Sequence, residues 1–166
     1  MNEINKKNKP LWAPWRIEYI LSEKKEECFL CNKERNNNKK DEFMVIFRAK
    51  YSFAILNAYP YISGHMMVCP YEHIGDISSL DKKVLNEMMD LCIKSKEALV
   101  CTMNPDGFNI GFNLGVAAGA GLEEHVHMHI VPRWIGDANF MSVLGDTRVI
   151  PQSLQETADL LRKHYV

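Results

Sequence analysis

The segment His125-Val126-His127-Met128-His129-Ile130-Val131 alternates histidines with apolar residues. Successive side chains of a strand point to opposite faces, whereas alternate residues of a helix point in widely different directions. As a strand, the segment places its histidines on one face and Val126, Met128 and Ile130 on the other. The apolar face requires a core, so the histidine face must border solvent, a metal or a ligand. The pattern indicates a functional strand, and a purely structural strand is the alternative.

Strand geometry disfavours a metal site built from all three histidines. A strand rises about 3.3 Å per residue, which separates the Cα atoms of His125 and His129 by about 13 Å. Neighbouring histidines, about 6.6 Å apart, are close enough to share an ion. At most two of them are therefore expected to bind the same metal, and at least one is left for another task.

Small residues fill the segment upstream, Asn113-Leu114-Gly115-Val116-Ala117-Ala118-Gly119-Ala120-Gly121. Without bulky side chains, backbone N–H groups can approach a phosphate closely. A plain turn has the same composition, so the segment indicates an anion site mainly because it precedes the histidine strand. Downstream, Pro132 is expected to end strand pairing because proline cannot donate to the ladder.

Composition favours a single domain of 166 residues with a real core, since 46% of the residues are hydrophobic. The net charge of -1 gives no sign of a nucleic-acid polymer as partner, and an isolated nucleotide fits better. The N-terminus has no signal-peptide pattern, and no apolar run is long enough to span a membrane. Five cysteines, an odd number, fit reduced thiols in the cytoplasm.

The chain predicts an α+β fold. Residues 1–10 are expected to be a disordered tail, and residues 11–166 a single domain with a solvated loop at residues 32–42. Strands are expected at residues 43–49, 51–57, 65–69, 108–113 and in the histidine run, with a long helix at residues 79–103 capped by Ser79 and a short C-terminal helix at residues 154–165. Strands in runs with few crossover helices predict an antiparallel sheet.

Cys28-Phe29-Leu30-Cys31 is a C-x2-C motif. Two thiolates at this spacing can hold one zinc ion from a tight turn, with two further ligands from elsewhere. A redox pair and two inert thiols are the alternatives, and the absence of a βαβ pattern around the motif argues against the redox pair. His73 and His125 are available as further ligands.

The histidine run matches the pattern of the histidine triad (HIT) family, in which histidine and apolar residues alternate and a second apolar residue follows. Gly64-His65, Cys69-Pro70 and His73 resemble the family's strand and turn segment. Leu11–Arg16 and Val131–Met141 resemble the branch that includes diadenosine tetraphosphate phosphorylases. The resemblance spans roughly residues 11 to 145.

This resemblance implies a HIT-like five-stranded antiparallel sheet that pairs in a homodimer. In the family the central histidine attacks the α-phosphate, so His127 is the expected nucleophile and forms a nucleotidyl-histidine. His129 and His65 are expected to orient or neutralise phosphate oxygens. Asn57 is expected to hold the ribose hydroxyls, although it also fits a turn before Tyr59. Metal-containing relatives imply a structural Zn²⁺ site formed by Cys28, Cys31, His73 and His125.

Charge that develops on the phosphate needs hydrogen-bond donors already in place. The expected donors are Asn113 and the backbone N–H groups of Gly119, Ala120 and Gly121. Many relatives carry a hydroxyl residue in this loop, but residues 115–124 contain no Ser or Thr. A backbone carbonyl of the same loop is the expected acceptor that fixes the tautomer of His127.

The group that attacks the nucleotidyl-histidine decides the activity. Attack by water makes the protein a hydrolase of dinucleoside polyphosphates or nucleoside phosphoramidates, whereas attack by phosphate makes it a phosphorylase that yields ADP and ATP from diadenosine tetraphosphate. The branch motifs favour the phosphorylase, with Arg133, Arg148 and Arg16 as candidate cations for phosphate and Trp134 helping to close the site. A zinc-stabilised nucleotide-binding regulatory protein is an alternative of another class, against which the intact central histidine argues.

Overall fold

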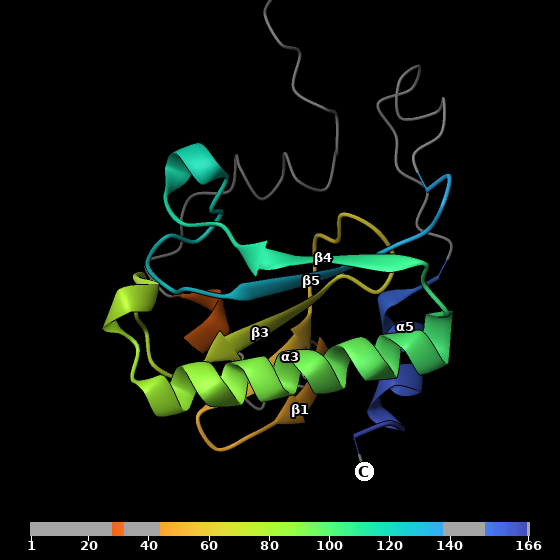
Figure 1. The fold of residues 1–166 in the computed structure, drawn as a ribbon, viewed down its shortest axis with the longest axis horizontal. Helices are drawn as coiled ribbons and strands as arrows, with labels where there is room; N and C mark the ends of the chain where they lie inside the picture. Colours follow the sequence, from red (N-terminus) through yellow and green to blue (C-terminus); the bar gives the residue numbers. More distant parts are fainter. Residues whose placement is uncertain (1–27, 32–43, 138–151, 166) are drawn as a thin grey trace, which may run out of the picture.

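The computed structural model describes residues 28–31, 44–137 and 152–165. Its centre is an antiparallel sheet with the strand order β1-β2-β3-β5-β4 (Figure 1). The strands are β1 (Val45–Arg48), β2 (Ser52–Leu56), β3 (Met66–Pro70), β4 (Gly107–Phe112) and β5 (Met128–Arg133). The expected α+β fold with a five-stranded antiparallel sheet is confirmed.

The long helix α3 (Lys82–Met103) lies across one face of the sheet, as Figure 1 shows, and the short helix α5 (Leu154–Arg162) packs against β1 and α3. Asp81, not Ser79, caps α3, and its side chain accepts a hydrogen bond from the N–H of Lys83. Ser79 instead ends a short 3₁₀ helix, η2 (Ile77–Ser79). Both residue types are good N-caps, so the sequence did not distinguish two positions this close together.

The two faces of β5 have different neighbours. Met128 and Ile130 are buried on the face that α3 covers. His129 projects from the other face, between its cross-strand partners Met67 on β3 and Gly111 on β4. The period-two pattern therefore separates an apolar side from a histidine side, as expected for a strand.

The ladder of β5 is shifted from the expected position. It begins at Met128, so His125 and His127 precede the paired residues, and it continues through Pro132, which pairs with Phe108 of β4. The expectation that Pro132 ends strand pairing is wrong. Pairing with β3 stops at Ile130, so Pro132 has a neighbouring strand on one side only, where a missing N–H donor is tolerated.

Several predictions concern residues outside the described ranges. These are the tail at residues 1–10, the loop at residues 32–42, and the candidate cations Arg16 and Arg148. Among the helices that the structure describes, none is both long and apolar enough to cross a membrane.

Candidate active site and metal cluster

The segment that carries His125 and His127 is held by the loop after β3. Between the two histidines, the N–H of Val126 donates to the carbonyl of Ile74 at 2.7 Å. The side chain of His125 donates from Nε2 to the carbonyl of Pro70 at 2.9 Å. These contacts position both histidines at the end of the sheet where β5 begins.

His127 is held as a neutral imidazole with one nitrogen unprotonated. Its Nδ1 lies 2.8 Å from the carbonyl oxygen of His125, so Nδ1 carries the proton and Nε2 carries the lone pair. The side chain is buried, which lowers the pKa of His127, and the hydrogen bond to the His125 carbonyl opposes that shift. The acceptor that fixes the tautomer is thus the carbonyl of His125, two residues upstream. The sequence analysis had instead expected a carbonyl in the loop of residues 115–121.

Four potential metal ligands converge beside this segment. The ligand atoms of Cys28, Cys31, His73 and His125 all lie within 4.8 Å of one another. The Nδ1 atom of His125 is 3.4 Å from Sγ of Cys28 and 3.5 Å from Sγ of Cys31, and Nδ1 of His73 is 3.4 Å from Sγ of Cys31. Tetrahedral zinc with ordinary Zn–S and Zn–N bonds has S···N edges of about 3.6 Å, so the donor set fits the ion.

Burial also prepares His125 to act as a ligand. Desolvation lowers the pKa of His125 from 6.5 to about 4, although the hydrogen bond to the Pro70 carbonyl opposes that shift. The imidazole is therefore neutral at physiological pH, as metal binding requires. Because Nε2 donates to Pro70, Nδ1 is the nitrogen that faces the two thiols, and the backbone carbonyl fixes this tautomer from behind.

His65 lies behind the triad and not on its open side. Its side chain is fully buried, with Nε2 3.0 Å from Nδ1 of His129 and Nδ1 accepting a hydrogen bond from the N–H of Tyr61 at 3.1 Å. Both ring nitrogens of His65 thus face protein groups. The role expected of His65, to orient or neutralise phosphate oxygens, stays a prediction, and in this geometry its Nε2 faces His129. His129 is the histidine that stands next to His127, with ring centroids 4.8 Å apart.

The two asparagines predicted to bind substrate both reach this group of histidines. Asn113 follows β4, and its Nδ2 lies 3.3 Å from Nε2 of His129. Asn57 follows β2, and its Oδ1 accepts from the N–H of Tyr59 at 2.8 Å while its Nδ2 lies 3.3 Å from Nδ1 of His65. Asn57 therefore makes the turn contact that was the alternative to ribose binding.

The small-residue loop lies at the same end of the sheet as His127, because it connects the end of β4 with the segment before β5. It contains the short 3₁₀ helix η3 (Val116–Ala118), and positive φ angles at Gly115 and Gly119 make glycine the suitable residue at both positions. The N–H groups of Gly119 and Ala120 donate to carbonyls inside the loop. In this conformation these two groups are committed, so phosphate binding through them requires the loop to rearrange.

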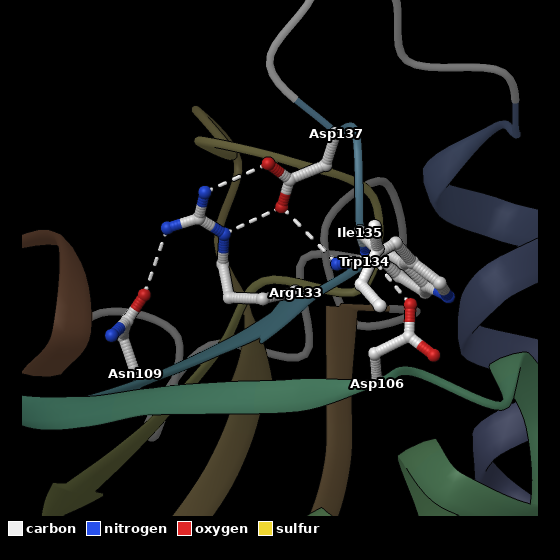
Figure 2. Close-up of polar contacts among 6 residues, drawn as sticks. All are labelled: Asp106, Asn109, Arg133, Trp134, Ile135 and Asp137. Atoms are coloured by element: carbon white, nitrogen blue, oxygen red, sulfur yellow. Dashed lines mark hydrogen bonds and ion pairs between the residues drawn. The ribbon is translucent and has the colours of Figure 1, made fainter.

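Arg133 and Trp134 lie at the opposite end of β5 (Figure 2). The guanidinium of Arg133 forms hydrogen bonds with both carboxylate oxygens of Asp137, at 2.5 and 2.7 Å, and with Oδ1 of Asn109 at 2.9 Å. The indole N–H of Trp134 donates to the carbonyl of Asn104. On strand spacing, Arg133 is about 13 Å from His129 at Cα. The structure thus does not bring these two residues to the triad, and Asp137 already neutralises the cation.

Sequence reasoning missed the groups that orient the histidines. Four of them are backbone groups, namely the carbonyls of Pro70, Ile74 and His125 and the N–H of Tyr61. No side-chain pattern marks a backbone donor or acceptor, so no sequence signal could have found them. The ring of Tyr61, which is tilted against the His65 ring with centroids 4.5 Å apart, was also missed, because its place depends on how the β2–β3 connection folds.

Comparison with known proteins identifies the family. A family model of the HIT domain matches residues 38–134, which is more than half of the chain. The chain belongs to the HIT domain family. This HIT protein is 38% identical over 164 residues to a protein of Mycobacterium tuberculosis named AP-4-A phosphorylase, a match that covers 91% of this chain and 81% of the relative.

Two further relatives bear on the activity and the metal. A Dictyostelium discoideum protein named Bis(5'-adenosyl)-triphosphatase is 30% identical over 89 residues, covering 54% of this chain and 59% of its own. The crystal structure of a Zn-bound histidine triad family protein from Mycobacterium smegmatis superposes with a TM-score of 0.60 at 26% identity, covering 73% of this chain and 82% of that one.

Proposed function

We propose that this HIT protein is a dinucleoside polyphosphate phosphorylase, which converts diadenosine tetraphosphate and phosphate to ADP and ATP. The observation that carries the proposal is His127, whose Nδ1–H is bound to the His125 carbonyl so that Nε2 is the nucleophilic nitrogen. The 38% identity to a protein named AP-4-A phosphorylase, over 91% of the chain, supports the choice of substrate and of phosphate as acceptor.

The first step transfers a nucleotidyl group to His127. Nε2 attacks the α-phosphorus, an N–P bond forms, and the bridging P–O bond breaks with its electron pair leaving on the oxygen of ATP. In the second step an oxygen of phosphate attacks the same phosphorus, the N–P bond breaks, and ADP leaves while the lone pair returns to Nε2. The Nδ1–H bond to the His125 carbonyl persists throughout and stabilises the positive charge on the substituted ring.

Residues around His127 then take distinct roles. We assign His129 and Asn113, which lie within hydrogen-bonding reach of each other, to the phosphate oxygens. We assign Asn57 to the ribose, which requires its turn contact with Tyr59 to open. The backbone N–H groups of Gly119, Ala120 and Gly121 would complete the phosphate contacts after a loop rearrangement. Arg133 and Trp134 take no part, which leaves Arg16 and Arg148 as the predicted cations for the acceptor phosphate.

We further propose that Cys28, Cys31, His73 and His125 hold one structural Zn²⁺ ion. The mutual distances of the four ligand atoms and the tautomer of His125 support this assignment. The ion would supply a rigid anchor and no open coordination position. Because His125 would be a ligand and its carbonyl accepts a hydrogen bond from Nδ1 of His127, the metal site would also fix the position of the His127 ring.

Product analysis tests the activity. Diadenosine tetraphosphate is incubated with the protein in phosphate-free buffer and in buffer with phosphate, and the nucleotides are separated by chromatography. We expect turnover to rise strongly with phosphate and to give ADP and ATP in equal amounts. Formation of AMP and ATP at equal rates in both buffers would show that water is the acceptor and that the protein is a hydrolase.

The hydrolase is the second candidate, because a relative is named Bis(5'-adenosyl)-triphosphatase. A nucleotide-binding regulatory protein is the alternative of another class. Labelling with substrate carrying radioactive phosphorus at the α-position separates the classes. Either enzyme is expected to yield an acid-labile covalent label on the wild-type protein and none on His127→Asn, whereas a regulatory binding protein yields no covalent label.

We also propose a cytoplasmic homodimer. The strand β4 is at one edge of the described sheet, and its Ile110 is 47% exposed on the side of the sheet that α3 covers, so a second copy pairing at this edge would bury it. None of the five cysteines forms a disulfide, which suits a reducing compartment. Light scattering on the purified protein tests the dimer, and a monomer mass at micromolar concentration would contradict it.

A further inference from the structure

The two histidines of the metal cluster have different surroundings. His125 is fully buried, and its Nε2 donates a hydrogen bond to the carbonyl of Pro70. The side chain of His73 is 43% exposed, and its Nδ1 lies 3.4 Å from Sγ of Cys31. The two rings meet edge to face, with centroids 5.3 Å apart. The His125 side of the cluster therefore faces the protein interior, whereas the His73 side faces solvent.

The outer nitrogen of His73 faces a carboxylate. Nε2 of His73 lies 3.9 Å from Oε2 of Glu124, at the distance of an ion pair. A hydrogen bond would need the two atoms to be about 1 Å closer. The side chain of Glu124 is 83% exposed, so it can cover this distance by a small rotation without meeting packed neighbours. Glu124 thus stands at His73 where the Pro70 carbonyl stands at His125.

Backbone contacts hold Glu124 beside His73. Glu124 lies in the segment that precedes β5, and His73 lies in the loop after β3. The N–H of Val126 donates to the carbonyl of Ile74 at 2.7 Å, which joins the two segments. They pack so closely that a Cβ at Gly75 would lie 3.2 Å from Cα of Glu124. Because the backbones are fixed in this way, only side chains have to adjust when the carboxylate approaches the ring.

A histidine that binds a metal through Nδ1 carries its proton on Nε2. A hydrogen-bond acceptor at Nε2 fixes the orientation of such a ring and makes Nδ1 a better ligand, and a carboxylate is a common acceptor in this place. In the present cluster Nδ1 of His73 is the nitrogen beside the thiol of Cys31, and Nε2 is the nitrogen beside Glu124. The geometry therefore gives Glu124 the place of an acceptor that supports a metal ligand.

We propose that Glu124 is a positioning residue for the metal site, whose carboxylate accepts the Nε2–H of His73 and holds Nδ1 toward the ion. The inference deepens the proposed function and rests on it, because it concerns the proposed zinc site. His73 is the exposed histidine of the cluster, so water and chelators reach it more easily than they reach His125. Glu124 consequently slows the loss of the metal by keeping this exposed ligand in place.

Zinc affinity and zinc release test the role without any substrate. Both are measured by competition with a chromogenic chelator on the full chain, for the wild type, Glu124→Ala and Glu123→Ala. Glu123 is the matched control, because it is the adjacent exposed glutamate and its removal changes the net charge equally. We expect Glu124→Ala to lower zinc affinity and to speed zinc release by about tenfold, which is the lower end for such partners because this pair is exposed to solvent. Glu123→Ala should stay within about twofold of wild type. Equal values for the two variants would overturn the proposal.

A second background separates support of His73 from simple attraction between a carboxylate and a cation. His73→Cys keeps a zinc ligand but removes the ring N–H that Glu124 would hold. Adding Glu124→Ala to His73→Cys should change zinc affinity by no more than about twofold. The same tenfold loss in both backgrounds would show that Glu124 acts on the charge of the ion, and would refute the role. If His73→Cys binds no zinc, the comparison of Glu124→Ala with Glu123→Ala decides.

The outcomes for the metal site and for this inference are distinct. A wild-type protein that holds no zinc would refute the proposed zinc site and the role of Glu124 with it. Zinc held equally tightly by the wild type and Glu124→Ala would refute the role of Glu124 alone. Neither result depends on whether phosphate or water is the acceptor in the nucleotidyl transfer.

Discussion

The substitution Gly75→Ala should disturb the nucleophile and the metal cluster together. Gly75 has no positive φ, so its requirement for glycine is one of space: a Cβ would lie 2.4 Å from the carbonyl oxygen of Glu123 and 3.2 Å from Cα of Glu124. Both neighbours are backbone atoms and cannot rotate away. Ordinary contact begins near 3.4 Å, so one of the two segments must move by about 1 Å.

The displaced segments are the ones that position the site. Residue 75 follows Ile74, whose carbonyl holds the N–H of Val126 at 2.7 Å, and residue 124 precedes His125. Overpacking of this kind costs about 1–3 kcal/mol of unfolding free energy, or about 2–12 °C in Tm for a chain of this size. A shift of about 1 Å at a reacting group lowers turnover by about 10²-fold.

Gly107→Ala is the matched control, because its Cβ would meet no atom within 4 Å and its φ is not positive. We expect it to leave Tm and turnover close to wild type. The assays are urea unfolding, zinc affinity by competition with a chelator, and turnover of diadenosine tetraphosphate. Gly75→Ala should lose stability, zinc affinity and kcat together. If it matches Gly107→Ala in all three, the close packing of the two loops does not position the site.

Three further predictions concern the site histidines and the metal. His127→Asn should keep the fold, because the amide nitrogen of Asn can replace Nδ1–H as donor to the His125 carbonyl. Its turnover should fall by about three orders of magnitude or more, and turnover within about tenfold of wild type would contradict the nucleophile assignment. Metal analysis should find about one Zn²⁺ per chain, and a chelator should lower Tm of the wild type but not of Cys28→Ser; a zinc-free protein as stable as the variant would contradict the metal site. In the metal-free protein, the pKa of His125 is about 6.5 in the unfolded state and about 4 in the folded state. The neutral His125 therefore adds to the free energy of unfolding fully above pH 6.5, and up to about 3 kcal/mol of this contribution is lost as the pH falls toward 4. Urea unfolding that does not change over this range would exclude the contribution.

The sequence by itself determined the class of fold and indicated the residues of the candidate site. Within β5, the alternation of Met128, His129 and Ile130 separates a core side from a histidine side, because successive side chains of a strand point to opposite faces. The long amphipathic segment that became α3 supplied the layer that covers the core side. Local pattern is sufficient for such features because each depends on residues within a few positions of one another.

The metal cluster was predicted in part from the sequence. The spacing of Cys28 and Cys31 indicated a pair of ligands, and the resemblance to the HIT family supplied His73 and His125. Only the fold brings these residues together, because the loop after β3 and the segment before β5 are joined by the hydrogen bond between Ile74 and Val126. Sequence spacing carries no information about that contact.

The tertiary structure alone decided which nitrogen of each histidine carries a proton and which predicted residues reach the triad. Arg133 and Trp134 were predicted to belong to the site because they follow the histidines closely in sequence. An extended strand separates them from His129 by about 3.3 Å per residue, and Asp137 binds the guanidinium of Arg133. His65 is 64 residues from His129 in the chain, and antiparallel pairing of β3 with β5 makes them neighbours. A tautomer depends on the partner of each nitrogen, and here the partners are backbone groups whose positions exist only in the folded chain.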